Sequence, residues 1–377
     1  MVAIAWHIYV LTGSALQLGL VGLARAVPYL SLNLIGGAVA DTIDRKRLLI
    51  YTQTFQMATS AWLIVSTMTG GANELTLYAV TFLSGAAQAF DLPPRQALTT
   101  NVVPADELAN ALTLNTLLRQ TSSIVGPAIG GVLIATVGLG WSYTANGISF
   151  VALTVGVLLM RPVRITRTNR ASTWELVVGG LKYAMSQPLV RWPLLLDFTT
   201  RGLGNARGLL PIFAKDVFDV GPVGLGWLNA ALAFGAVAGG LVLGARGQPK
   251  HPVPLMLGAY AAEAIGLIGV GLSPTFWLAL VLLGLMGIAN VLGEVPRITL
   301  VQLSTPDELR GRVSALAYMF TYGGPQLGQL ESGAVASFAG APIAAVVGGT
   351  AAILAVFGFS LPLRQHMRPA EAPAAVA

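Results

Sequence analysis

The chain has 377 residues, of which 54% are hydrophobic and only 10% charged, and its mean hydropathy is +0.71. A soluble domain of this length would lack the polar surface to cover itself, so composition places the chain in lipid. The absence of cysteine excludes disulfides and thiol chemistry. The net charge of +6 is spread over the ends of apolar segments, which argues against a nucleic-acid surface.

The chain begins with an apolar run, residues 1–11, that is too short to cross a membrane. At about 1.5 Å per residue it reaches roughly half of a ~30 Å hydrocarbon core. It also lacks the basic region that starts a signal peptide. We interpret it as the second half of a first helix whose beginning is absent; a short signal sequence is the alternative.

Longer apolar runs follow at regular intervals, each near the roughly 20 residues that a spanning helix needs. They predict eleven further spans, at residues 16–39, 48–70, 74–91, 112–137, 141–160, 192–214, 223–245, 252–272, 274–294, 312–336 and 340–363.

Between the first two of these runs lies an acid-then-base segment, Gly36 to Arg47, which predicts a compact turn outside the bilayer. Its glycines permit either a sharp turn or a close approach of two helices. Asp41 can bond exposed helix-end amides. The cluster Arg45, Lys46 and Arg47 is typical of a cytoplasmic loop.

The other basic residues agree with that orientation. If Arg45 to Arg47 lie inside the cell, the alternating loops place every loop Lys and Arg on the same side except Lys215. Such an asymmetry supports both the spans and the topology.

The chain also repeats itself at a spacing of about two hundred residues. Asp91-Leu92-Pro93-Pro94-Arg95 recurs as Glu294-Val295-Pro296-Arg297, and both are interpreted as loop motifs that follow a span. Gly126-Pro127 recurs as Gly324-Pro325. The repeat predicts two six-helix halves.

The predicted organisation is therefore an N-terminal half at 1–160, a polar linker at 161–191, a C-terminal half at 192–363 and a disordered tail at 364–377. Within the linker, Ser172 and Glu175 have the spacing of a capping box. Trp174, Leu181 and Met185 recur at helical intervals, which predicts an amphipathic helix on the cytoplasmic face.

Two six-helix halves, a basic central linker and the segment Gly37 to Arg47 together resemble the major facilitator superfamily. Within it, the chain is most similar to the bacterial branch that holds the enterobactin exporter and related efflux permeases. The resemblance implies an all-α polytopic fold of two six-helix pseudo-repeats, with the first helix incomplete. The signature has glycine where this chain has Asp44, a departure that adds a second acid and lowers the flexibility of the turn.

A second signature lies in the span at 112–137. Gly126, Pro127, Gly130 and Gly131 favour a bent helix that others approach closely. They resemble the motif of proton-coupled antiporters in the superfamily, with ordinary small-residue packing as the alternative. The span at 74–91 lacks the arginine that many such antiporters carry.

The resemblance also implies a gating role for Asp41. In the superfamily, this aspartate contacts the cytoplasmic start of the eleventh helix and latches the two halves together. The corresponding start here is at Gly311 and Arg312.

Charges inside the spans are the candidates for a substrate or proton pathway, because each costs about 2.5–3.5 kcal/mol unless it is paired or hydrated. Asp197 and Arg201 are four residues apart and can pair on one helix face. Arg207 follows in a glycine-dense segment that predicts a bend. The resemblance implies that Arg207 lines the cavity, because helices 1 and 7 line the central cavity in the superfamily. The remaining candidates, for each of which a purely structural role is the alternative, are Arg25, Arg119 and Glu263.

The expected function is secondary active transport, with proton-coupled efflux of a small siderophore-like or drug-like molecule by alternating access. The alternatives are a symporter or importer, or a truncated, transport-inactive membrane partner. An enzyme is not expected because the chain lacks a nucleophile or metal set, and no cofactor is expected. Protons, a small molecule and the bilayer are the expected partners of a monomer in the bacterial inner membrane, without nucleic acid.

Overall fold

The computed structural model describes residues 1–102, 107–160, 173–247, 249 and 251–365. Some side chains within its helices lie outside the description, among them those of Asp41 and Arg119. The described elements are helical. In the N-terminal half they are α1 (Val2–Thr12), α2 (Ala15–Thr42), α3 (Arg45–Met68), α4 (Glu74–Val102) and α5 (Leu108–Leu159).

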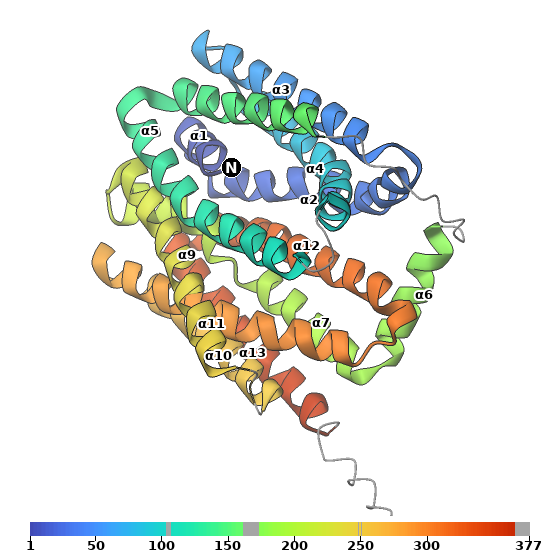
Figure 1. Ribbon diagram of the computed structural model, residues 1–377. Coiled ribbons are helices and arrows are strands. Elements are labelled where there is room, and N and C mark those ends of the chain that lie inside the picture. The colour runs from blue at the N-terminus through green and yellow to red at the C-terminus, as the bar shows by residue number, and fades with distance from the viewer. Residues whose placement is uncertain (103–106, 161–172, 248, 250, 366–377) are drawn as a thin grey trace, which may run out of the picture.

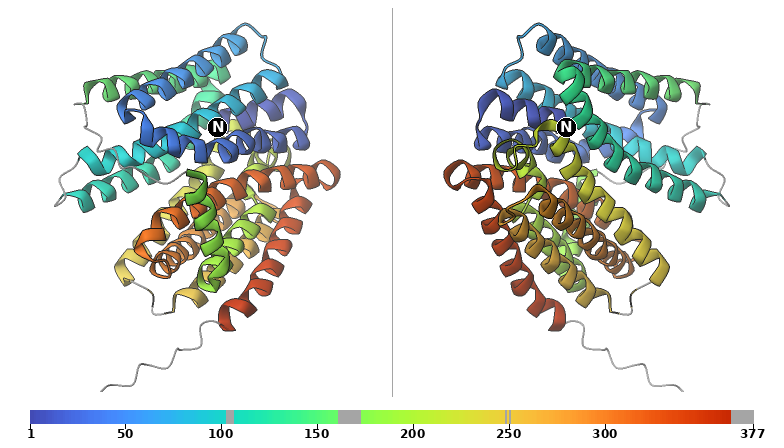
Figure 2. Two further views of the ribbon diagram at one scale, coloured as in Figure 1. Left: turned by 90° about the vertical axis from the view of Figure 1, so that its right-hand side faces the viewer. Right: turned by 90° about the vertical axis from the view of Figure 1, so that its left-hand side faces the viewer.

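The second half follows α6 (Thr173–Ser186) and begins with a broken helix. Its elements are α7 (Pro188–Leu203), α8 (Ala206–Ile212), the π-helical turn η1 (Phe213–Val217), α9 (Gly221–Arg246), α10 (Pro252–Gly271), α11 (Phe276–Leu303), α12 (Asp307–Ala339) and α13 (Ala341–Gln365). Figures 1 and 2 show α1–α4 and α10–α13 as two separate bundles stacked on each other.

The two-fold repeat predicted from the motifs is present in the backbone. α5 is two helices joined at Gly138, where φ is 84° and the chain turns back on itself (Figure 1). The corresponding hairpin between α12 and α13 turns at Gly340, also with φ 84°. Glycine is the residue that tolerates this conformation, so both halves use the same device at the same place.

Six described helical segments are long and apolar enough to cross a membrane: Ala15–Asn33, Val125–Leu159, Gly221–Arg246, Pro252–Gly271, Phe276–Leu303 and Ala341–Leu363. The remaining predicted spans correspond to α3, α4, α12 and the broken helix α7–α8. α7 and α8 are each too short to span by themselves. α3, α4 and α12 are less apolar because they carry polar residues, such as Gln53, Asp91 and Ser332, that are buried within the protein.

The N-terminal and C-terminal halves contact each other through α2 with α12 and through α5 with α9. Glycines bring these helices together: a Cβ on Gly333 would lie 2.7 Å from the Cα of Gly19. Nearby, the Gln329 side chain donates a hydrogen bond of 3.1 Å to the Leu18 carbonyl. These contacts lie near the start of α2 and the end of α12, which we call the outer end; the opposite end, with Arg45 to Arg47, is the basic end.

A polar contact reinforces the outer end. The Tyr9 hydroxyl of α1 donates a hydrogen bond to the Asp216 carboxylate of η1, in the other half. The Lys215 ammonium lies 5.2 Å from the centroid of the Tyr9 ring, within the range of a cation–π interaction. The halves are therefore held together at the outer end in this structure.

The prediction of a turn over Gly36 to Arg47 is wrong in length. The turn is much shorter, because α2 continues to Thr42 and α3 begins at Arg45. Only Ile43 and Asp44 connect them. Gly36 serves close helix packing instead, since a Cβ there would lie 2.2 Å from the Ala89 carbonyl oxygen of α4.

At the basic end, hydrogen bonds from Lys46 and from α6 fix the end of α5 and the position of α6. Lys46 donates a hydrogen bond of 2.8 Å to the Leu158 carbonyl and so caps the end of α5. The Tyr183 hydroxyl of α6 donates one of 2.8 Å to the Ser304 carbonyl, which follows α11. α6 thus packs on the C-terminal bundle.

Candidate functional site

A break in the seventh spanning segment positions the candidate site. α7 ends at Leu203, and α8 restarts after Asn205, whose side chain accepts a hydrogen bond of 3.1 Å from the Arg207 amide. The Asn205 amide group also donates to the Pro325 carbonyl of α12. Glycines on neighbouring helices make room for carbonyls at the break, as a Cβ on Gly328 would lie 2.3 Å from the Arg201 oxygen. The bend predicted from the glycine-dense sequence is present.

Asp197 on α7 is the centre of a buried polar network and is 0% exposed. Its carboxylate accepts hydrogen bonds from Arg201 Nε at 2.7 Å and from the Tyr260 hydroxyl of α10, also at 2.7 Å. The Thr321 hydroxyl of α12 donates a third, of 3.0 Å. The pair predicted from the spacing of Asp197 and Arg201 therefore forms, and helices from distant parts of the chain complete it.

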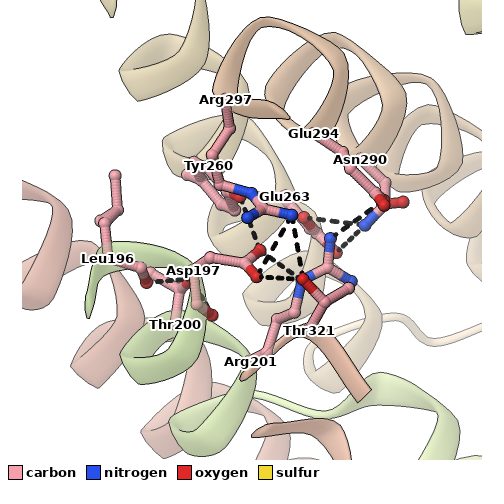
Figure 3. A network of polar contacts seen from close by, with 10 residues as sticks. All are labelled: Leu196, Asp197, Thr200, Arg201, Tyr260, Glu263, Asn290, Glu294, Arg297 and Thr321. Atoms are coloured by element: carbon pink, nitrogen blue, oxygen red, sulfur yellow. Dashed lines mark hydrogen bonds and ion pairs between the residues drawn. The ribbon is translucent and has the colours of Figure 1, made fainter. Parts of the chain in front are cut away.

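Arg297 of α11 supplies the second cation. Its Nη2 lies 3.6 Å from the Asp197 carboxylate and 2.9 Å from the Thr321 hydroxyl, to which it donates. Arg201 in turn reaches Glu294, one turn before Arg297, at 3.4 Å. Figure 3 shows the two guanidinium groups and the Tyr260 hydroxyl converging on Asp197.

Glu263 of α10 is the third carboxyl of this region and differs from the other two. The Asn290 amide donates to its two oxygens at 3.2 and 3.5 Å, and no described Arg or Lys forms a salt bridge with it. It lines a small cavity inside the C-terminal bundle together with Arg201 and Tyr260. Glu263 is therefore the member of the group without a cation in direct contact.

Arg207 lies beside this network but is exposed. It interacts electrostatically with Arg201, Glu263 and Glu294, and the structure gives its guanidinium no hydrogen bond or salt bridge among the described residues. A charged side chain so close to buried charges is unfavourable unless water reaches it. Arg207 does not line the cavity beside Glu263, and its predicted place on a cavity wall stays a prediction.

The N-terminal half carries the repeat-related counterpart of the network. Asp91 of α4 accepts hydrogen bonds from Thr52 at 3.0 Å, from Gln53 at 2.6 Å and from Arg95 at 2.7 Å. The prediction that the motifs at Asp91, Pro94, Arg95 and at Glu294, Pro296, Arg297 lie in loops is wrong. Both lie inside helices, α4 and α11, because each helix continues beyond its apolar stretch.

The candidate Arg25 and the buried His7 both have neutral partners. Arg25 of α2 donates a hydrogen bond of 2.7 Å to the Gln88 side chain of α4. His7 is buried, with its Nδ1 3.0 Å from the Tyr143 hydroxyl. For His7 this contact indicates packing between α1 and the second part of α5.

The residues predicted to gate the protein are described only in part. Asp44 is the N-cap of α3 and accepts a hydrogen bond of 2.9 Å from the Arg47 amide, which accounts for an acid at this position. Arg312 packs on α6, since a Cβ on Gly180 would lie 2.8 Å from its Cβ. The surroundings of Gly37 and Gly311 and the side chains of Asp41 and Arg119 lie outside the description.

The Gly-Pro motif of α5 divides into two kinds of position. Gly131 lies against α9, where a Cβ would be 2.4 Å from the Pro222 oxygen and 3.0 Å from the Gly226 Cα. A Cβ on Gly126 or Gly130 would meet no described atom within 4 Å. Gly131 therefore joins the two halves, whereas the other two glycines do not in this structure.

This difference predicts opposite effects of alanine within one motif. Gly131→Ala forces α5 away from α9 and is expected to cost about 1–3 kcal/mol, the usual range for overpacking. Gly126→Ala is the matched control; it is expected to be neutral or to stabilise by up to about 1 kcal/mol through helix propensity. Thermal unfolding of the two purified variants measures the difference, and equal midpoints would contradict this packing.

Sequence reasoning missed Tyr260, Thr321 and Asp216. Nothing in the local pattern distinguishes Tyr260 or Thr321 from other polar residues in apolar helices. The pairing of Glu294 and Arg297 with Asp197 and Arg201 also left no local signal, because the partners are about one hundred residues apart. Among the described residues, no group of three or more His, Asp or Glu side chains could hold a metal ion.

The sequence matches the family described as transmembrane secretion effectors over residues 1–376. Among curated proteins it is similar to the enterobactin exporter EntS of Escherichia coli O127:H6, with 27% identity over 321 residues, 84% of this chain and 76% of the relative. The enterobactin exporter of Shigella boydii serotype 18 is 26% identical over 317 residues, with the same coverage.

Among solved structures, the fold is similar to that of a variant of the nucleoside transporter NupG, with a TM-score of 0.77 and 13% identity. That match covers 96% of this chain and 94% of the other. A bacterial homologue of the lysosomal transporter Spinster gives a TM-score of 0.74 at 16% identity, over 99% of this chain and 96% of the other.

Proposed function

The chain belongs to the transmembrane secretion effector family of major facilitator transporters and is a multi-pass protein of the bacterial inner membrane, and on this premise we propose that it exports a small organic molecule in exchange for protons. The family and the relatives make it an exporter-like transporter rather than an enzyme. Proton coupling and the siderophore-like or drug-like class of cargo are the new parts of the proposal.

The buried network in the C-terminal half is the observation that carries the proton coupling. Asp197 and Glu294 each form a salt bridge with an arginine, whereas Glu263 hydrogen-bonds the neutral Asn290 and forms no salt bridge with a described residue. A carboxyl inside a span that no paired cation holds is the one we propose as the proton carrier. Glu263 also lines an internal cavity, which gives a proton a place to arrive.

Alternating access links this network to movement of the halves. The outer end is closed by contacts between α2 and α12 and between α5 and α9, which supports the proposal that this structure is the state in which the basic, cytoplasmic end opens. Gly131 lies in one of those contacts, which supports a role of the Gly-Pro motif in the movement between states. We include the latch of Asp41 with Gly311 and Arg312 in the proposal, as a contact formed when the cytoplasmic end closes.

Inside-out membrane vesicles from cells that produce the protein provide the test. With the vesicle interior acidified, protons leaving the vesicle should drive inward accumulation of enterobactin or of aromatic drugs, relative to vesicles without the protein. A protonophore should abolish the accumulation. Accumulation that ignores the protonophore would remove the proton coupling, and uptake driven by external acid in right-side-out vesicles would indicate a symporter.

A further inference from the structure

A groove runs between α11 and α12 in the C-terminal half and is separate from the internal cavity beside Glu263. It extends from the basic ends of the two helices, near Gln302 and Ser314, to Glu294 and Thr321 deeper in the bundle. Its deep end therefore meets the charge network, and its shallow end lies where cargo from the cytoplasm would arrive.

One wall of the groove is aromatic. Tyr318 and Tyr322, one turn apart on α12, are 42% and 40% exposed, and their rings are nearly parallel, with centroids 6.3 Å apart. Tyr29 of α2 packs edge-on against Tyr322 with a centroid distance of 6.2 Å, so this wall faces the other half rather than lipid. Exposed, parallel rings offer a surface on which a planar ligand can stack.

The charge that a ligand can reach in this groove is negative. The Glu294 side chain is 31% exposed, and its one salt bridge with a described residue is a long one, of 3.4 Å, to Arg201. Arg297 also borders the groove but is only 1% exposed and is engaged with Asp197 and Thr321. Its Nε and Nη1 have no hydrogen-bond partner among the described residues, yet both are buried beyond the reach of a ligand in the groove.

We propose that this groove binds an aromatic organic cation, with the ring on Tyr318 and Tyr322 and the amine on the Glu294 carboxylate. The inference rests on the proposed export function and narrows its cargo from siderophore-like or drug-like molecules to drug-like aromatic cations. An ammonium group gains both a charge-assisted hydrogen bond to a carboxylate and attraction to the faces of aromatic rings. An anion of the same size would meet Glu294 first and be repelled.

The contact to Arg201 makes this site part of the proton pathway. A ligand amine draws the Glu294 carboxylate away from a guanidinium that also holds Asp197 and lies beside Glu263. Cargo and proton would thus compete for one set of charges, which is the arrangement that exchange requires.

Binding to the full chain in nanodiscs tests the proposal with three probes that share one ring system. These are 1-naphthylmethylamine, a cation; 1-naphthoate, an anion; and 1-naphthylmethanol, which is neutral. The cation is expected to bind at least tenfold more tightly than the other two. Glu294→Gln should remove that preference, and Tyr318→Leu should weaken all three probes while Tyr318→Phe, which keeps the ring, should not.

Glu331→Gln is the matched control, because Glu331 is an acid in a spanning helix outside the groove and hydrogen-bonds Ser332; it should leave the preference for the cation unchanged. Tighter binding of 1-naphthoate, or a preference for the cation that survives Glu294→Gln, would overturn the proposal. Neither result would affect gradient-driven export measured in vesicles. Conversely, a groove that selects the cation in a protein without gradient-driven export would support this site and contradict the proton coupling.

Discussion

Asp197→Asn is expected to lower the free energy of unfolding by about 3–5 kcal/mol, the usual cost of removing one partner from a buried ion pair. The reason is the burial of the cations that would remain. Arg297 is 1% and Arg201 16% exposed, so neither guanidinium can turn to bulk water when the carboxylate loses its charge. Thermal unfolding of the purified protein in detergent, followed by tryptophan fluorescence, measures the effect.

Asp91→Asn is the matched control in the N-terminal half. Asp91 also accepts several hydrogen bonds and pairs with an arginine four residues along the helix. Its partner Arg95, however, is 44% exposed and can be hydrated once the acid is neutralised. We expect less than half the loss seen for Asp197→Asn; a loss as large or larger would show that burial of the cations is not the deciding factor.

Glu263→Gln is expected to reduce gradient-driven export more than tenfold while substrate exchange without a gradient continues. Glutamine has the shape of the protonated acid but cannot release a proton, so the halves can still exchange positions without being driven. Two measurements in the same vesicles separate these effects, accumulation with an interior-acid gradient and counterflow at equal pH.

The control for Glu263→Gln is Glu331→Gln, which neutralises an acid of a spanning helix that lies away from the network. It should leave both rates at the level of the unmodified protein. Full gradient-driven export by Glu263→Gln would exclude Glu263 as the proton carrier. Loss of counterflow together with export would instead indicate a structural role for its bond to Asn290.

Several features of the fold could be predicted because they depend on neighbours in the chain. The spans follow from the lengths of apolar runs, and the hairpin glycine Gly138 lies between two of them. Gly340, which turns the corresponding hairpin of the other half, is the first residue of the predicted span 340–363. The pairing of Asp197 with Arg201 follows from helical spacing, and the bend before Arg207 follows from local glycine density. Each of these is a short-range property of the backbone.

The ends of several helices could not be predicted from hydropathy. A helix can continue past its apolar residues when its polar side chains find hydrogen-bond or salt-bridge partners inside the protein. Asp91 and Glu294 were assigned to loops, yet α4 and α11 continue through them, since their charges are neutralised by Arg95 and Arg201. Similarly, α2 continues through the glycines before Asp41 because Gly36 packs against Ala89.

The sequence by itself determined that this is a membrane protein of two related helical halves, and it identified the charged residues within the spans. Composition, the spacing of apolar runs and the internal repeat are all properties that can be read directly from the sequence. Only the tertiary structure decided which of those charges act together. Asp197 meets Tyr260, Arg297 and Thr321 across 63 to 124 positions of sequence, and Glu263 is left with a neutral partner. Contacts between distant helices depend on how the helices pack in three dimensions, and local sequence patterns contain no information about that packing.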